Sequence, residues 1–249
     1  MKIKSGALLI TSVAIVLGIW FFLTSILGVR DIFLPSIGDT FSKLVELSKT
    51  SEFWLDIKSS FFRVFVGFLF SILVAYPLVI ASLINKNVKE IVFYIVEFFR
   101  YLPIPVFIPL TILWFGVDDA GKVMIVFLGT FAQMIPMFYD STQLLENKYN
   151  AFSYGLKWKK WAYVKNITMV DSAPYIFDNS RLCFGWAWTY LIIAELLGAE
   201  NGLGYAIIRA QRYLATDKIF AYIITIGLIG VLIDRSMILL KKHLFKWHI

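Results

Sequence analysis

Residues 64–85 read VFVGFLFSILVAYPLVIASLIN, a run without a single charged side chain. A helix of this length, at 1.5 Å per residue, crosses the roughly 30 Å of hydrocarbon in a bilayer. A second charge-free run of comparable length covers residues 5–29. Further apolar runs that reach this length with their flanking residues lie at residues 101–117, 123–139, 172–198 and 219–233. The sequence therefore predicts an all-α polytopic membrane protein.

The composition favours the same class. Hydrophobic residues make up 59% of the chain and charged residues 16%, whereas soluble domains carry about 25% charged residues. The mean hydropathy is +0.74. Six predicted transmembrane helices leave no room for a soluble domain, so the whole chain, 1–249, is one transmembrane domain. The predicted spans are residues 5–29, 60–85, 91–117, 122–143, 172–198 and 218–240.

The distribution of Lys and Arg predicts the topology. The basic start, Met1-Lys2-Ile3-Lys4, precedes an apolar run longer than a signal-peptide core, so we expect an uncleaved first helix. With the N-terminus inside, inner segments carry thirteen Lys and Arg residues and outer segments carry eight. Both termini are thus predicted to face the cytoplasm. The net charge of +7 is explained by this topology and by anionic lipid headgroups in the bilayer, without nucleic acid.

The connection at about residues 144–170 is basic and has a helical pattern. Small and aromatic side chains recur at spacings of three and four, at Ala151, Tyr154, Trp158, Trp161 and Ala162. Lysines occupy the other faces, and Gly155 allows a bend. Two interpretations stay open: a basic helix held on the inner leaflet, or an elbow that docks into a cytoplasmic partner.

A second amphipathic segment is predicted outside, after the turn Leu34-Pro35-Ser36. Phe41, Leu44, Val45 and Leu47 there suggest a helix lying on the membrane surface.

Ionisable residues inside spans cost roughly 2.5–3.5 kcal/mol each at the helix centre, so they need partners or water. Glu97 with Arg100, and Asp178 with Arg181, are spaced three apart and can pair on one helix face. These pairs either brace helix packing or form a gate, with the arginines offering bidentate donors to an anion.

Glu195 opens the stretch ELLGAENGLGY and has no basic residue within one helical turn. It is predicted either to accept hydrogen bonds from backbone amides of the glycine-rich turn or to line a transport path.

Pro103 and Pro105 remove backbone donors early in the third span. The resulting kink is either a hinge in a pathway or a purely architectural bend. Trp188 either packs in the bundle or lines a cavity.

Several function classes are disfavoured. The two histidines, His243 and His248, lie near the chain end and Cys183 is isolated, so we expect no metal site and no nucleophile–base pair. No Walker-type phosphate loop is present. The chain is therefore not expected to be an enzyme or to hold a cofactor. A secondary transporter that couples to ions through Glu195 or Asp178 is an alternative, although no internal repeat supports it. A membrane scaffold is another.

Four segments carry a resemblance to a known family. They are LPS at residues 34–36 with the following surface helix, SFFRVFVGFLFSILVA at 60–75, RYLPIPVFIPLTILWFG at 100–116 and AELLGAENGLGY at 194–205. In this order they resemble the permease subunit of a type I ABC importer, the binding-protein-dependent inner-membrane component. Within that family they are most similar to the nitrate, sulfonate, taurine and bicarbonate group.

The resemblance implies a permease of the bacterial cytoplasmic membrane that moves a small polar or anionic solute inward: sulfonate, taurine, nitrate or a vitamin precursor. The implied partners are ABC ATPase subunits that bind ATP and Mg²⁺, an external binding protein and a second permease. The implied ATPase-coupling loop contains Tyr149, Asn150, Ala151, Tyr154, Gly155, Trp158, Lys159 and Lys160. The residue patterns described above make Glu97, Arg100, Pro103, Pro105, Asp178, Arg181, Trp188 and Glu195 the candidates for a translocation path or gate.

The coupling loop departs from the family pattern. Where the family has Glu-Ala-Ala, this chain has Tyr149-Asn150-Ala151, and Met169-Val170 replaces a Leu-Pro. The second permease is therefore expected to be either another copy or a different subunit that keeps the stronger coupling sequence.

Overall fold

The computed structural model describes residues 2–156 and 160–248, and within that part the chain is helical without a strand. Side chains of residues 1–7, 9, 144–159, 197 and 248–249 lie outside the description. The helices are α1 Lys2–Phe21, α2 Ile37–Ser48, α3 Ser51–Ile84, α4 Lys86–Tyr101, α5 Ile108–Phe115, α6 Asp119–Leu156, α7 Lys160–Tyr163, α8 Met169–Gly198, α9 Leu203–Arg212 and α10 Thr216–Leu244. The predicted all-α fold is confirmed.

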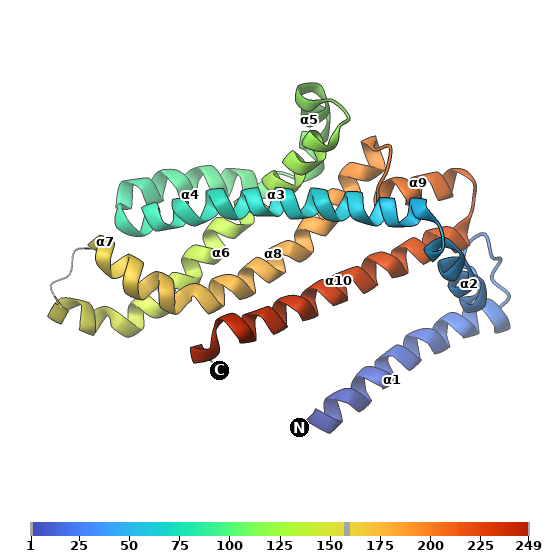
Figure 1. The fold of residues 1–249 in the computed structure, drawn as a ribbon, viewed down its shortest axis with the longest axis horizontal. Coiled ribbons are helices and arrows are strands. Elements are labelled where there is room, and N and C mark those ends of the chain that lie inside the picture. Colours follow the sequence, from blue (N-terminus) through green and yellow to red (C-terminus); the bar gives the residue numbers. More distant parts are fainter. Residues whose placement is uncertain (1, 157–159, 249) are drawn as a thin grey trace.

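The centre of the molecule is the packing of α3, α6 and α8 (Figure 1). Two glycines on these helices allow close approach: a Cβ on Gly67 would lie 2.7 Å from Val126, and one on Gly129 would lie 2.3 Å from the ring of Tyr190. Phe68 and Phe184 meet edge to face with their ring centroids 4.8 Å apart. Larger residues at the two glycine positions would push the helices apart.

The predicted surface helix after Leu34-Pro35-Ser36 is confirmed as α2. Ser36 caps it, since its hydroxyl accepts a hydrogen bond from the Asp39 amide (3.0 Å). Leu47 is buried against the core, whereas Phe41 is 65% exposed. The predicted apolar residues are thus divided, since Leu44 and Leu47 face the core while Phe41 and Val45 are exposed, and the helix packs against α10 (Figure 1).

The third predicted span is broken. Instead of one kinked helix over residues 91–117, α4 ends at Tyr101, a 3₁₀ turn covers Ile104–Phe107, and α5 begins at Ile108. The two helices are bent by 93°. Pro103 and Pro105 have no N–H, and the residue before a proline avoids the helical region, so the helix cannot run through this segment. The break follows from these prolines, but its size exceeds an ordinary kink.

Three helices in the described residues are long and apolar enough to cross a membrane: α3, the 119–143 part of α6, and α10. The bent pair of α4 and α5 makes a fourth if it is one span. The predicted segments at 5–29 and 172–198 are helical, as α1 with a following π-helical turn and as α8. The count of six spans stays a prediction.

α6 is longer than the predicted span at 122–143. It continues to Leu156, one residue after Gly155, and α7 with a π-helical turn at Val164–Thr168 leads back into α8. The predicted loop at 144–170 is therefore largely helical and forms an elbow. This elbow lies at the opposite end of the bundle from α9 (Figure 1), and we refer to these as the elbow end and the α9 end.

Candidate functional site

A buried guanidinium organises the α9 end of the bundle. Arg63 on α3 is 2% exposed, and its Nη1 donates to Oε1 of Glu195 on α8 (2.7 Å) and to the main-chain oxygen of Asn201 (2.9 Å). Its Nη2 donates to Asn201 Oδ1 (2.6 Å), and its Nε donates to Asp119 Oδ1 (2.7 Å). Nη2 also lies 2.6 Å from that Asp119 oxygen. The five donors of the guanidinium thus have five contacts, so Arg63 is a brace between helices.

Glu195 is buried at the centre of the same network. Besides Arg63, its carboxylate accepts hydrogen bonds from the Ser60 hydroxyl (2.8 Å) and from the Gly204 amide (2.9 Å). The prediction that Glu195 accepts hydrogen bonds from the glycine-rich turn is confirmed. Because both oxygens are occupied by the protein, this conformation offers no free carboxylate to a passing solute.

The glycines of the turn make room for this carboxylate. Gly202 has φ 119°, and a Cβ there would lie 2.4 Å from Glu195 Oε1. A Cβ on Gly204 would lie 2.7 Å from Glu195 Cβ. Positive φ and close contact both require glycine at position 202. The buried carboxylate of Glu195 therefore explains why positions 202 and 204 are both glycine.

Two further contacts tie α9 to α3. Asp56, buried on α3, accepts a hydrogen bond from the Gly202 amide (2.9 Å) and another from the Tyr222 hydroxyl (3.4 Å). Arg209 on α9 forms an ion pair with Glu52 near the start of α3. The Glu52 carboxylate raises the pKa of the Arg209 guanidinium above its ordinary value. The whole α9 end is thus one hydrogen-bonded unit.

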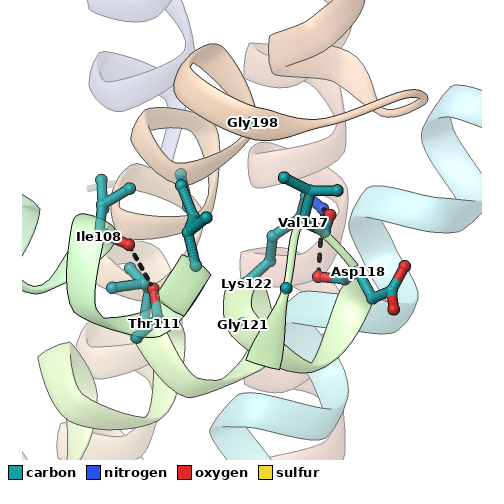
Figure 2. A pocket seen from close by; sticks show the side chains of 11 residues that line it. Ile108, Thr111, Val117, Asp118, Gly121, Lys122 and Gly198 are labelled. Carbon is teal, nitrogen blue, oxygen red and sulfur yellow. Dashed lines mark hydrogen bonds between the residues drawn. The ribbon is translucent and has the colours of Figure 1, made fainter. Parts of the chain in front are cut away.

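A small pocket lies beside this unit, between α5, α6 and α8 (Figure 2). The Lys122 ammonium donates to the main-chain oxygens of Val117 and Asp118, and the Thr111 hydroxyl donates to that of Ile108 (2.9 Å). The pocket has room for about one water molecule. It does not hold an organic solute in this conformation.

The predicted pair on the third span, Glu97 and Arg100, is not among the described contacts of the Arg63 network. Glu97 and Arg100 are both exposed on α4, and no ion pair joins them among the described contacts. Tyr94, Phe98 and Tyr101 are 73%, 65% and 87% exposed on the same helix. Pro103 and Pro105 lie in the break between α4 and α5. This part of the chain thus exposes charged and aromatic side chains, and no ion pair involves Glu97 or Arg100 among the described residues.

The other predicted pair braces α8 against α10. Asp178 and Arg181 lie 3.7 Å apart, but each has a closer partner on α10. Arg181 Nε is 2.9 Å from Asp234 Oδ1, and Lys241 forms an ion pair with Asp178. Asp234 lies in the predicted sixth span and Lys241 directly follows it. Spacing within one helix could not predict these pairings, because they join two different helices.

Trp188 lines an apolar groove between α8, α9 and α10 and is 7% exposed. Its indole nitrogen has no hydrogen-bond partner in the described structure. Trp188 therefore packs in the bundle and also forms part of the wall of a groove, so each of the two predicted roles holds in part.

The predicted coupling loop is described only in outline. Tyr149, Asn150, Ala151, Tyr154 and Gly155 lie in the last turns of α6, where only the backbone is described. Trp158 and Lys159 lie outside the described residues. Lys160 begins α7 and is exposed. The described backbone of the end of α6 and Lys160 lie at the elbow end, away from the Arg63 network at the α9 end (Figure 1).

Sequence reasoning missed several members of that network. Asp119, Asn201, Ser60 and Asp56 were not predicted as site residues. One signal was present: Asp56, Ser60 and Arg63 follow at spacings of four and three, which places three polar side chains on one face of an apolar helix. The partners on α6 and α9 follow only from the tertiary fold.

No group of three His, Cys, Asp or Glu side chains in the described part of the chain is arranged to hold a metal ion.

Known proteins are similar to this chain in sequence and in fold. The family model for the binding-protein-dependent transport system inner membrane component matches residues 67–246. The chain is 25% identical to the taurine transport system permease protein TauC of Escherichia coli K12, over 98% of this chain and 91% of the relative. It is 27% identical to the putative aliphatic sulfonates transport permease protein SsuC of Bacillus subtilis (94% and 85%). It is 26% identical to the nitrate import permease protein NrtB of Synechococcus elongatus (94% and 88%).

Among solved structures, the fold is similar to a chain of the MetNI methionine ABC transporter in an inward-facing conformation. The TM-score is 0.68 at 15% sequence identity, covering 76% of this chain and 96% of that one. Membership of this transporter class removes the alternatives of an ion-coupled secondary transporter and of a scaffold. The family match spans most of the chain, so the protein belongs to the binding-protein-dependent transport system inner membrane components and is the permease subunit of an ABC importer.

Proposed function

We propose that this permease forms half of an ATP-driven importer for a small organic or inorganic anion of the sulfonate or nitrate kind. The relatives named for taurine, aliphatic sulfonates and nitrate support this substrate class. The observation that carries it is Arg100, an exposed arginine on α4 that has no ion pair among the described residues, on a helix that also exposes Tyr94, Phe98 and Tyr101.

Arg100 is the residue that suits such a substrate. A guanidinium binds a sulfonate or nitrate through two parallel hydrogen bonds. Arg100 is exposed and has no ion pair in the described structure, unlike Arg63 and Arg181. Tyr94, Phe98 and Tyr101 on the same helix are also large exposed side chains, and in a membrane protein such side chains lie against lipid, against a partner or along a path. We assign this face to the translocation path.

A second permease completes the path. The described helices leave part of α4 and α5 uncovered: Tyr101, Leu113 and Trp114 are 87%, 77% and 63% exposed. The partner is either another copy of this chain or a different permease subunit. Pro103 and Pro105 place the bend between α4 and α5 on this face, so it can act as a hinge when the two permeases move.

The elbow formed by the end of α6 and by α7 is the proposed contact with the ATPase subunits. It projects at the end of the bundle away from α9 (Figure 1), and Lys160 on it is exposed. ATP and Mg²⁺ would bind to those subunits and not to this chain. Both chain termini and the elbow then face the cytoplasm, in agreement with the excess of Lys and Arg there.

The α9 end is the proposed docking surface for an external binding protein. The network around Arg63 holds α3, α6, α8 and the turn before α9 together, so this end moves as one body. A rigid outer surface lets the binding protein deliver its solute while the elbow end responds to the ATPases.

The assembly is tested by purifying the tagged chain from its native cells in mild detergent and identifying the copurifying proteins by mass spectrometry. The proposal predicts an ABC ATPase, and a second permease if the assembly is a heterodimer. Recovery of the chain alone under conditions that preserve a known ABC importer from the same cells would contradict it.

A further inference from the structure

Two hollows lie between α8 and α10, and we refer to them together as the cleft. The two helices lie side by side (Figure 1), but α10 packs mainly against α2 and α9. At the elbow end the cleft widens into a pocket of ≈ 1060 Å³, including its open mouth, whose charged lining residues are Asp178, Arg181, Lys241 and Lys242. Toward α9, the second hollow between these helices is an apolar groove of ≈ 920 Å³, again including its open mouth.

The charged pocket has positive charge left over. Asp178 and Asp234 offset Lys241 and Arg181, while Lys242 is exposed and has no ion pair among the described residues. Arg181 is only partly satisfied, because its Nε contacts Asp234 at 2.9 Å without the geometry of a hydrogen bond. Unused donors and net positive charge at this position fit an anionic group.

The apolar groove fits a hydrocarbon chain. Glycines on both walls, Gly185 on α8 and Gly230 on α10, leave the groove open, since a Cβ on either would meet no atom within 4 Å. Ile192, Ile223 and Ile226 supply apolar walls. The Trp188 side chain adds an aromatic wall to this groove.

The spacing of the two parts matches one lipid leaflet. Arg181 and Ile192 are eleven residues apart on α8, about 16 Å along a helix, and one leaflet contributes about 15 Å of hydrocarbon. The aromatic and basic end of α10, with Lys246 and Trp247, is typical of a membrane–water interface. We infer that the cleft between α8 and α10 binds one anionic phospholipid, with its phosphate at Arg181 and Lys242 and an acyl chain along Gly185 and Gly230.

The test measures lipid retention by native mass spectrometry on the purified importer complex titrated with phosphatidylglycerol or phosphatidylcholine. We expect preferential retention of phosphatidylglycerol. Lys242→Gln should weaken it about fivefold, the effect of one positive charge near the membrane surface. Lys86→Gln is the matched control, since Lys86 is an exposed lysine on α4 outside the cleft, and it should have no effect. Equal losses in both variants, or none in either, would overturn the inference.

A second pair of variants tests the acyl groove. Gly230→Leu should fill it and reduce retention of the lipid, whereas Gly18→Leu on exposed α1, where a Cβ also meets no atom within 4 Å, should not. Unchanged retention in Gly230→Leu would contradict the groove assignment.

The same preparation distinguishes the lipid from two other possible occupants of the cleft, a soluble phosphate compound and the second permease. Glycerol phosphate in excess should not displace the lipid, and displacement would assign the site to a soluble phosphate compound. A disulfide formed between cysteines placed at Gly230 and on a helix of the second permease would assign the cleft to that subunit instead.

Discussion

Nη1 of Arg63 lies 2.7 Å from Oε1 of Glu195, and 132 residues separate them in the chain. Both side chains are almost completely buried, at 2% and 0% exposure. Their charges are compensated by each other, by Asp119 and by hydrogen bonds from Ser60 and Gly204. The pair therefore fixes where α8 and the α9 turn sit on α3.

Glu195→Ala should destabilise the folded permease by about 3–5 kcal/mol, because it leaves a buried guanidinium without its main partner. Thermal unfolding of the detergent-solubilised protein measures this. Glu200→Ala is the control, since Glu200 is an exposed acid in the same turn, and it should leave the unfolding temperature unchanged. Equal unfolding temperatures for the two variants would show that the Arg63 network does not hold this end together.

Two glycine substitutions should have opposite effects. Gly202→Ala places a Cβ 2.4 Å from Glu195 at φ 119° and should lower stability by about 1–3 kcal/mol. Gly38→Ala lies in α2, where the Cβ meets only Ser36 Oγ at 3.7 Å, and should raise stability by up to about 1 kcal/mol. Chemical denaturation of both variants gives the comparison. A stable Gly202→Ala protein would mean that the turn adopts another backbone.

Arg100→Gln should reduce solute uptake by about tenfold or more, since a hydrogen bond to a charged group contributes roughly 1.5–3 kcal/mol. The measurement is initial uptake rate at matched expression. Arg235→Gln, at an exposed arginine on α10, is the control and should transport normally. Normal uptake by Arg100→Gln would remove this residue from the path.

The elbow should couple ATP hydrolysis to transport. Reversing Lys159 and Lys160 together to Glu, or replacing Gly155 by Pro in the last turn of α6, should leave ATP hydrolysis running while uptake falls. The proline removes a helix hydrogen bond and clashes with the preceding turn. The two rates are measured on the same preparation, with Lys86→Glu as a charge-reversal control. Tight coupling in both elbow variants would exclude the elbow from the mechanism.

Local chemistry explains what the sequence could predict. The helix after Leu34-Pro35-Ser36 and the break near Pro103 and Pro105 depend on neighbouring residues, so pattern and spacing reveal them. The hydrogen bond from the Gly204 amide to Glu195 was also within reach, because only nine residues separate the groups.

Tertiary packing explains what the sequence could not predict. Arg63 reaches Asp119 and Asn201 only because three helices meet at one end of the bundle. Asp178 and Arg181 prefer partners on α10 over each other for the same reason. The 93° bend between α4 and α5 depends on how α5 packs against α6, which the prolines alone do not determine.

The central claim is that this permease moves a small anion inward using ATP. The most direct measurement reconstitutes the purified complex in liposomes and follows uptake of labelled taurine, an alkanesulfonate or nitrate, with and without ATP on the ATPase side. The account predicts uptake that requires ATP and the binding protein and that persists when a proton ionophore is present. Uptake that continues without ATP and collapses with the proton gradient would contradict it.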